Sequence, residues 1–133
     1  MTGIIAGNFD VIHSGYLQMF NDINNHVQEI HALLHIDSSL NRPGKIKPLL
    51  SVEDRTMTSL ALKGITKVST YNSEKQLLKL IIDINPEIRF LGDNCINRTN
   101  YTGHGLLPEI IFLNRNHGWS TIKFKKLIAN SIK

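Results

Sequence analysis

Short apolar runs alternate along this chain with segments in which apolar residues recur every three or four positions. The runs predict five β-strands, within residues 2–6, 28–36, 67–71, 87–91 and 109–113. The recurring segments predict four helices, which run from Ser14 to about His26, from after Ser51 to about Lys63, from after Ser73 to the residue before Pro86, and from Ser120 to about Asn130. Residues 28–36 also fit a helix, and this alternative stays open at the level of the sequence.

Polar and conformationally special residues mark the ends of the predicted helices. Ser51 is a suitable N-cap, and Gly64 is suited to end the helix that Ser51 begins. Ser73 and Gln76 have the spacing of a capping box. Residues 37–50 contain Ser-Ser, Pro-Gly and a further proline, which predicts a loop.

The predicted elements alternate between strand and helix, with a long loop before the last strand. Such alternation is typical of an α/β fold with a mainly parallel sheet, here five-stranded, and with helices on both faces. At 133 residues the chain is expected to form a single domain, residues 1–133. Ligands of such folds bind beyond the carboxyl ends of the strands. The segments expected there are residues 7–16, 37–50, 92–105 and 114–120.

The composition, with 41% apolar and 20% charged residues, is that of an ordinary globular protein. No apolar run is long enough for a membrane span, and the chain opens with a strand-like segment rather than a signal peptide. The single cysteine, Cys95, cannot form an internal disulfide, which fits a reducing compartment. We therefore expect a cytoplasmic protein without a membrane partner.

The net charge of +4 fits a solubilising surface, a surface for nucleic acid, or a site for a small anionic ligand. No aromatic residues are interleaved with the basic ones, and no recognition-helix motif is present, so nucleic acid is not the expected partner. The positions of the basic residues favour a small polyphosphate instead.

The stretch GNFDVIHSGY, residues 7–16, places two glycines and a histidine where a strand leads into a helix. Gly7 and Gly15 allow the backbone to approach a ligand closely. The helix that follows points unpaired N–H groups at the same space, which favours an anion, and His13 can donate to a phosphate oxygen. The alternative is a plain strand–helix turn, in which Asp10 caps the helix and His13 is a satisfied structural residue.

Further candidates for the same site are spread along the chain: Lys45, Lys47, Arg55, Ser59, Lys63, Arg115, Ser120 and Thr121. Arg55, Ser59 and Lys63 are four residues apart, so they are predicted to share one side of a helix. Each of these side chains alone would be an ordinary solvated residue. Basic positions gathered at one end of the sheet would suit a triphosphate, because negative charge accumulates on the departing pyrophosphate.

A metal site in the protein itself is not expected. His31 and His35 have the spacing of two zinc ligands on a helix, but the glutamate of HExxH is absent and the segment fits a strand better. No CxxC motif or third ligand accompanies them. GxSxG, Walker and GxGxxG motifs are also absent from the sequence.

The stretch GNFDVIHSGY resembles the GxFDxxHxGH signature of the cytidylyltransferase-like nucleotidyltransferases. LLSVEDR (49–55), FLGDNC (90–95) and NRNHGWSTIKFKKLI (114–128) resemble further motifs of that family, in the same order, the last being R-x-x-G-[IW]-S-T-T-x-I. The resemblance spans the chain from Gly3 to Ile128 and is closest to the glycerol-3-phosphate cytidylyltransferases. It implies a Rossmann-like fold and a homodimer.

The resemblance also implies a reaction, in which a phosphorylated alcohol attacks the α-phosphate of CTP and releases pyrophosphate without a covalent enzyme intermediate. Magnesium would be bound through the nucleotide phosphates, and no metal ligand of the protein is implied. The implied catalytic residues are His13, Arg115, Lys47 and Lys45. The implied nucleotide-binding residues are Gly7, Asn8, Phe9, Asp10, His13, Tyr16, Gly92, Asp93, Asn94, Arg115, Gly118, Ser120 and Thr121. Arg55 and Lys63 would face the phosphate of the second substrate or the triphosphate.

The chain departs from the family pattern at several positions. Tyr16 replaces the second histidine of the signature, Lys63 replaces an arginine, Asn94-Cys95 replaces Asp-Trp, and the last motif reads STI in place of STT. The hydroxyl of Tyr16 could face the phosphates, or its ring could pack inward against Phe20. Three other functions stay open: an adenylyltransferase acting on a sugar phosphate, a nucleotide-binding protein with impaired catalysis, and a nucleic-acid-binding domain.

Overall fold

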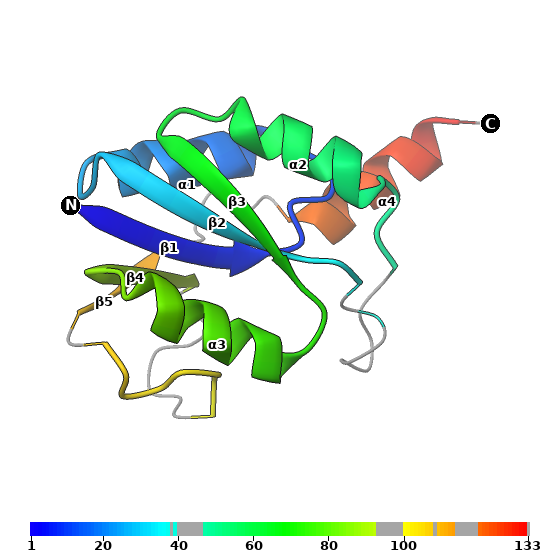
Figure 1. Ribbon diagram of the computed structural model, residues 1–133. Coiled ribbons are helices and arrows are strands. Elements are labelled where there is room, and N and C mark those ends of the chain that lie inside the picture. The colour runs from blue at the N-terminus through cyan, green and yellow to red at the C-terminus, as the bar shows by residue number, and fades with distance from the viewer. Residues whose placement is uncertain (38, 40–46, 93–99, 108, 114–119, 133) are drawn as a thin grey trace.

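The computed structural model describes residues 1–37, 39, 47–92, 100–107, 109–113 and 120–132. Within them the five predicted strands and four predicted helices are all present (Figure 1). The strands are β1 (Thr2–Gly7), β2 (Glu29–His35), β3 (Ile65–Tyr71), β4 (Ile88–Gly92) and β5 (Ile110–Leu113), and the helices are α1 (Ser14–Asn24), α2 (Val52–Leu60), α3 (Glu74–Ile84) and α4 (Thr121–Ser131). Residues 29–35 form a strand, so the helical alternative for that segment is wrong.

The strands form one sheet in the order β3-β2-β1-β4-β5, and each neighbouring pair is parallel. The predicted parallel α/β sheet is thereby confirmed. β1 lies at the centre, with β2 on one side and β4 on the other. The chain reverses its direction of travel across the sheet between β3 and β4, so the carboxyl end of β1 is the switch point at which ligands bind in such sheets.

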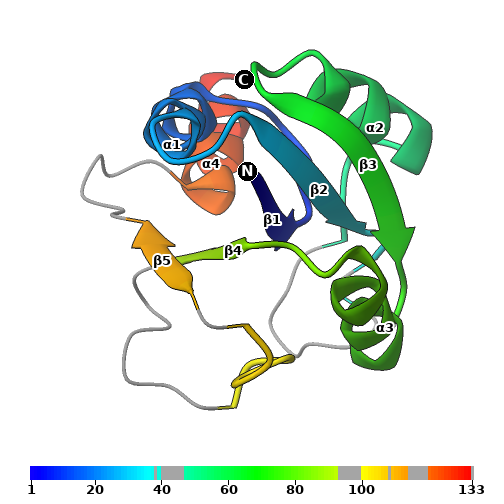
Figure 2. The ribbon, with the colours of Figure 1, turned by 60° about the vertical axis from the view of Figure 1, so that its left-hand side comes forward.

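Helices cover both faces of the sheet, as predicted (Figures 1 and 2). Alternate residues of each strand point to opposite faces, so Ile5 packs in the core beneath α1 and α2, and Ile4 packs in the core beneath α3. Phe20 and Ile23 of α1 belong to the first core. Leu77 and Ile81 of α3 belong to the second core.

The end of α2 was predicted too late. The helix ends at Leu60 rather than near Lys63, because the N–H groups of Ala61 and Leu62 bond to the carbonyls three residues before them and tighten the last turn. Gly64 then turns the chain into β3 with φ +89°, a left-handed conformation. Lys63 therefore lies outside the helix that was expected to carry it.

Ser51, Ser73 and Ser120 are the N-caps of α2, α3 and α4, and the side chain of each accepts from a backbone N–H group. Capping was predicted for Ser51 and Ser73, whereas Ser120 was predicted only to begin the last helix. The capping box at Ser73 differs in one bond, because the Gln76 side chain accepts from the N–H of Asn72 and not from that of Ser73.

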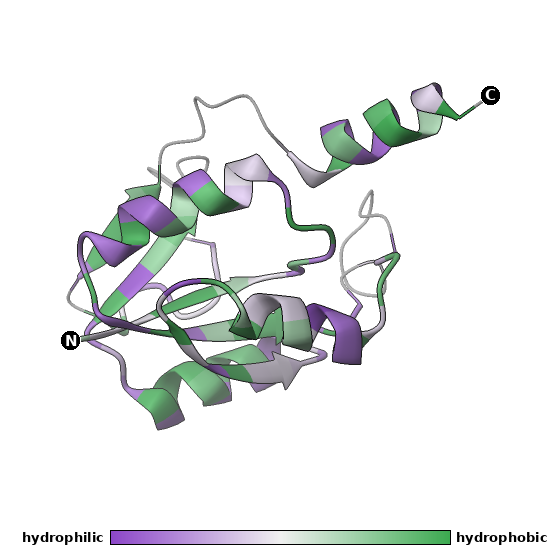
Figure 3. Ribbon diagram, turned by 90° about the horizontal axis from the view of Figure 1, so that it is seen from above, coloured by the Kyte–Doolittle hydropathy of each residue, from purple (hydrophilic) through white to green (hydrophobic). Residues whose placement is uncertain are grey.

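The last helix, α4, runs out from the sheet toward the C-terminus (Figure 3). None of the residues that form it is fully buried, and Ile122, Leu127 and Ile128 are exposed. Across the described ranges, no helix has both the length and the apolar character needed to cross a bilayer.

Candidate active site

The loop from β1 to α1 carries the first group of candidate residues. Phe9 adopts φ +48°, which costs a residue other than glycine roughly 1–2 kcal/mol. Its ring is almost fully buried and packs 5.8 Å from the ring of Tyr16 and 6.2 Å from that of Phe20. Burial of this ring offsets the backbone strain and fixes the turn, which leaves Asn8 and Asp10 at the carboxyl end of the central strand.

His13 is the N-cap of α1. Its Nδ1 atom accepts from the N–H of Gly15 at 3.1 Å, so the neutral ring carries its proton on Nε2. That Nε2 atom lies 3.4 Å from the hydroxyl oxygen of Thr121 at the start of α4. The alternative reading of the loop gave the capping role to Asp10, and the structure gives it to the histidine instead.

The ring of Tyr16 packs against the core beneath α1, and its hydroxyl lies at the start of α4; that the hydroxyl faces the phosphates stays a prediction. Its ring packs against Phe9 and lies 4.7 Å from the ring of His13, while its hydroxyl lies 3.2 Å from that of Thr121. His13, Tyr16 and Thr121 thus form one cluster, called here the amino-end cluster because α1 and α4 both begin at it. The amino end of a helix carries a partial positive charge and unsatisfied N–H groups, so this place favours an anion.

Asp10 joins three segments that are far apart in the sequence. Its buried carboxylate accepts from the N–H groups of Leu49 at 2.8 Å and Leu50 at 2.9 Å, and from the ammonium group of Lys125 on α4. Burial alone would raise the pKa of Asp10, but the hydrogen bonds from Lys125 and the two amides outweigh it and hold the pKa below its usual value.

Arg55 is placed differently from the expectation. Its side chain is 2% exposed, and its guanidinium donates to the carbonyl oxygens of Leu50, Asn8, His35 and Ile36. These bonds tie the start of α2 to the ends of β1 and β2. The geometry supports a role in holding the carboxyl edge of the sheet together, and it does not support the predicted contact with a phosphate.

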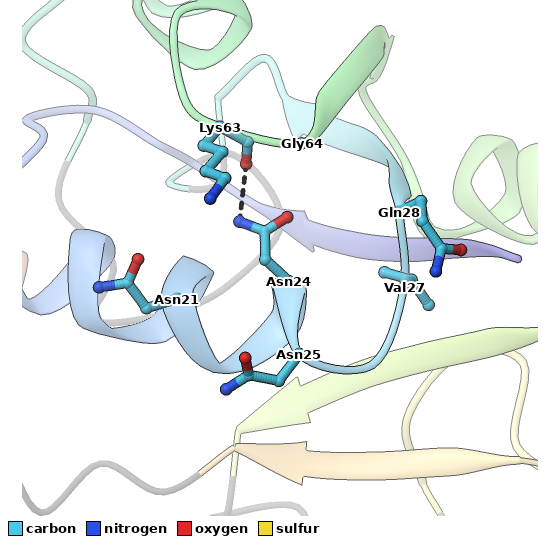
Figure 4. A pocket seen from close by; sticks show the side chains of 7 residues that line it. All are labelled: Asn21, Asn24, Asn25, Val27, Gln28, Lys63 and Gly64. Carbon is cyan, nitrogen blue, oxygen red and sulfur yellow. Dashed lines mark hydrogen bonds between the residues drawn. The ribbon is translucent and has the colours of Figure 1, made fainter.

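Lys63 comes just before β3, so it lies at the amino ends of the strands, whereas the site lies at their carboxyl ends. Its predicted place in the site is therefore wrong. Its carbonyl accepts from the side chain of Asn24 at the end of α1, and Gly64 then opens β3. A shallow polar pocket is found there, lined by Asn21, Asn24, Asn25, Val27, Gln28, Lys63 and Gly64 (Figure 4). The other candidate residues that the structure describes do not line this pocket.

The remaining candidates divide into two groups. The first group lies where the ligand is expected, at the ends of β1 and β4, before α2, or at the start of α4. Its members are Gly7, Asn8, Lys47, Gly92, Ser120 and Thr121. Lys47 is exposed, and the side-chain oxygen of Asn8 is buried without a hydrogen-bond partner in the described parts of the chain. Lys45, Asp93, Asn94, Arg115 and Gly118 lie outside the described residues.

Sequence reasoning missed Lys125 and Phe124. The ring of Phe124 lies 5.7 Å from that of His13, and Lys125 pairs with Asp10. One signal could have found the lysine: Thr121 and Lys125 are four residues apart on a predicted helix, so they share a face. If Thr121 belongs to the site, Lys125 is expected to point toward the site as well, because both residues lie on the same face of the helix.

Comparison with known proteins identifies relatives across most of the chain. The family model described as Cytidylyltransferase-like matches residues 4–127. An FAD synthase of Methanohalophilus mahii is 29% identical over 93 residues, which cover 69% of this chain and 63% of that protein. An FAD synthase of Methanosarcina barkeri is 32% identical over 102 residues, 75% of this chain and 71% of the relative. The ethanolamine-phosphate cytidylyltransferase of Mus musculus is 28% identical over 67 residues, 48% of this chain and 17% of the mouse protein.

The chain thus spans under two thirds of the Methanohalophilus protein and a small part of the mouse enzyme. Among solved structures, the lipopolysaccharide core biosynthesis protein from Thermoplasma volcanium gives a TM-score of 0.66 at 21% identity, over 85% of this chain and 95% of that one. This likeness supports the Rossmann-like fold. These relatives do not point specifically to a glycerol-3-phosphate cytidylyltransferase.

The matched range begins in the central strand and ends in α4, and it includes His13, Tyr16, Thr121 and the Asp10–Lys125 pair. With the fold and the whole length of the site covered by one family model, the chain belongs to the cytidylyltransferase-like family of nucleotidyltransferases.

Proposed function

We propose that this chain is a cytidylyltransferase, which transfers CMP from CTP to a phosphorylated alcohol similar to glycerol 3-phosphate and releases pyrophosphate. The observation that carries the proposal is the amino-end cluster, where the first and the last family motif meet through Tyr16, His13 and Thr121. Hydroxyl and imidazole donors there would surround a polyphosphate, and two helix amino ends would favour its charge. The part of the chain that carries the base-binding motif, residues 93–95, lies outside the described residues.

In the proposed reaction an oxygen of the acceptor's phosphate attacks the α-phosphorus of CTP. The bond from that phosphorus to the oxygen bridging it to the β-phosphorus breaks, and pyrophosphate leaves with the electron pair. Such a transfer needs positioning and charge stabilisation rather than a covalent intermediate. His13, oriented by its bond from Gly15, would donate from Nε2 to a phosphate oxygen. Lys45, Lys47 and Arg115 would add positive charge around the departing pyrophosphate.

Magnesium is proposed to enter the site on the nucleotide. In the described segments, no group of three or more His, Cys, Asp and Glu side chains could hold a metal ion. Asp10 already accepts from two amides and from Lys125, so its carboxylate is not an open ligand. Phosphate oxygens are preferred ligands of magnesium, and the chemistry that the ion supplies is neutralisation of the charge on the triphosphate.

A second candidate function is adenylyl transfer. It is favoured by the two FAD synthases, because FAD synthase is an adenylyltransferase. The amino-end cluster would suit the phosphates of either nucleotide, so the choice of base would rest elsewhere in the site. A third possibility, a nucleotide-binding protein with impaired catalysis, is motivated by Tyr16, which replaces a histidine of the family signature.

The test is a panel of the four nucleoside triphosphates with magnesium, read by thermal shift and by pyrophosphate release. The acceptors are glycerol 3-phosphate, ethanolamine phosphate, a sugar phosphate and flavin mononucleotide. A nucleotide at about 100 times its dissociation constant stabilises the fold by roughly 2.7 kcal/mol. We expect the largest shift with CTP. A shift with ATP alone would move the assignment to adenylyl transfer, and equal shifts with all four would remove the base assignment.

The homodimer and the cytoplasmic location implied at the level of the sequence are also part of this proposal. Light scattering of the purified protein, with and without CTP, tests the first. Fractionation of cells that express the chain tests the second.

A further inference from the structure

One face of α4 contacts the start of α1 and the loop before it. Thr121, Phe124 and Lys125 lie on that face and meet Tyr16, His13 and Asp10. None of the residues of α4 is fully buried, so apolar packing contributes less to its attachment than it does for a helix with a buried face. Polar contacts therefore help to hold the amino end of α4 against α1, beside the ring of Phe124.

The contact between Lys125 and Asp10 is the most protected of these polar contacts. The carboxylate side chain is 3% exposed and the lysine side chain 15%, so water screens the pair far less than it screens an ion pair on the surface. Asp10 is also held by the amides of Leu49 and Leu50, and its place does not depend on the lysine. Asp10 is thus a fixed anchor, to which Lys125 attaches α4.

The position of Lys125 on the helix gives this attachment a consequence for the site. Lys125 lies four residues after Thr121, which places the two side chains about one helical turn apart on the same face. Fixing the lysine therefore fixes the threonine and the N-cap, Ser120, next to His13 and Tyr16.

We infer that Lys125 is a positioning residue of the nucleotidyl transfer, which holds the amino end of α4 in the amino-end cluster through its ion pair with Asp10. The inference rests on the proposed function, because the proposed function supplies the phosphates that the amino-end cluster would bind. Lys125 itself does not need to touch the nucleotide. Its effect is on the fraction of molecules in which α4 lies in place before the nucleotide binds.

This role predicts a particular pattern in the kinetics. When only a fraction of the protein is competent to bind, the apparent dissociation constant rises by the inverse of that fraction. A saturating nucleotide pulls the helix back into place, so the rate at saturation recovers. Loss of the ion pair should thus raise the KM for the nucleotide and leave kcat nearly unchanged.

The experiment compares Lys125→Met, Lys125→Arg and Lys126→Met by steady-state pyrophosphate release. Lys126→Met removes the same charge from the next, exposed position of the same helix and is the matched control. We expect Lys125→Met to raise the nucleotide KM about tenfold with kcat within about twofold. Lys125→Arg should restore most of the affinity, and Lys126→Met should behave like the wild type. If Lys125→Met does not fold, Lys125→Gln, which removes the charge of the ion pair but keeps a polar side chain, takes its place.

Three outcomes would overturn the inference. The first is an unchanged nucleotide KM in Lys125→Met. The second is a fall in kcat with KM unchanged, which would make the lysine a group that touches the transition state. The third is an equal effect in Lys126→Met, which would reduce the observation to a loss of net charge.

Failure of the proposed function can be told apart from failure of this inference. If the wild type turns over no nucleotide, the proposed function fails, and the attachment of α4 is read without ligand by hydrogen–deuterium exchange. Amides of α4 should then exchange faster in Lys125→Met than in the wild type and Lys126→Met. Equal exchange in all three proteins overturns the positioning role whether or not the chain is an enzyme.

Discussion

Tyr16→Phe removes one hydroxyl from the amino-end cluster and keeps the ring that packs against Phe9 and His13. In the structure this hydroxyl lies 3.2 Å from the hydroxyl of Thr121, a neutral group, and that distance is long for a bond between hydroxyls. We therefore expect the hydroxyl to contribute only about 0.5 kcal/mol to the free energy of unfolding. Thr121 keeps its contact with His13 in the variant. The melting temperature should therefore fall by no more than roughly 3 °C.

The expected effect on turnover is larger than the effect on stability. If the Tyr16 hydroxyl turns to a phosphate when the nucleotide binds, it becomes a hydrogen bond to a charged group, worth about 1.5 kcal/mol at the low end. Pyrophosphate release by Tyr16→Phe should then fall about tenfold. Tyr16→His should preserve or raise turnover, because an imidazole can donate and carry charge, yet it should lower the melting temperature because the packing against Phe9 is reduced.

Both variants are assayed for pyrophosphate release and for thermal unfolding. Turnover of Tyr16→Phe equal to that of the wild type would refute the reasoning, since the hydroxyl would then have no part in the reaction. An inactive wild type beside an active Tyr16→His would identify a binding protein whose catalysis was lost at this position.

His13→Ala should cut pyrophosphate release by on the order of 10²–10³, the usual loss for one preorganised donor, while His13→Asn, which keeps an N-cap acceptor, should restore stability but not rate; full activity in His13→Asn would contradict the role of Nε2. The lowered pKa of Asp10 means that its contribution to stability is complete above the unfolded value near 3.8 and is lost as the pH falls through the lower folded value. The difference in the free energy of unfolding by urea between the wild type and Asp10→Asn should therefore shrink below about pH 4. A difference independent of pH would contradict a contribution from the ionised carboxylate. Lys63→Ala should leave the nucleotide KM and kcat unchanged, because Lys63 lies beside Asn24 at the amino ends of the strands; a loss of activity would restore the original assignment of this lysine.

The order of the elements could be predicted because its signals are local. Apolar runs mark the buried strands, and Ser51, Ser73 and Ser120 cap helices through bonds to residues three positions away. The end of α2 was misplaced because it depends on where the chain must turn into β3, which is set by the sheet and not by the helix. The error carried Lys63 into the predicted site.

The contacts of the site depend on residues far apart in the sequence, and a single sequence does not show such contacts. Asp10 meets amides 39 and 40 residues away and an ammonium group 115 residues away. Neither its partners nor the burial of Arg55 under four carbonyl groups can be read from residue spacing. That His13 and Thr121 both belong to one site was predicted from the rule on strand ends and from the family motifs, but the contact between the two side chains was not.

The central place of β1 has a consequence for the way the chain folds as it is synthesised. β1 leaves the ribosome before the other four strands of this sheet. It can pair with β2 almost at once, but its other edge waits for β4, at Ile88–Gly92. During that interval an edge that contains Ile4 and Ile5 is open to any other extended segment. Slow translation before residue 92 would prolong this exposure, so aggregation of the nascent chain should be most sensitive to changes between β3 and β4.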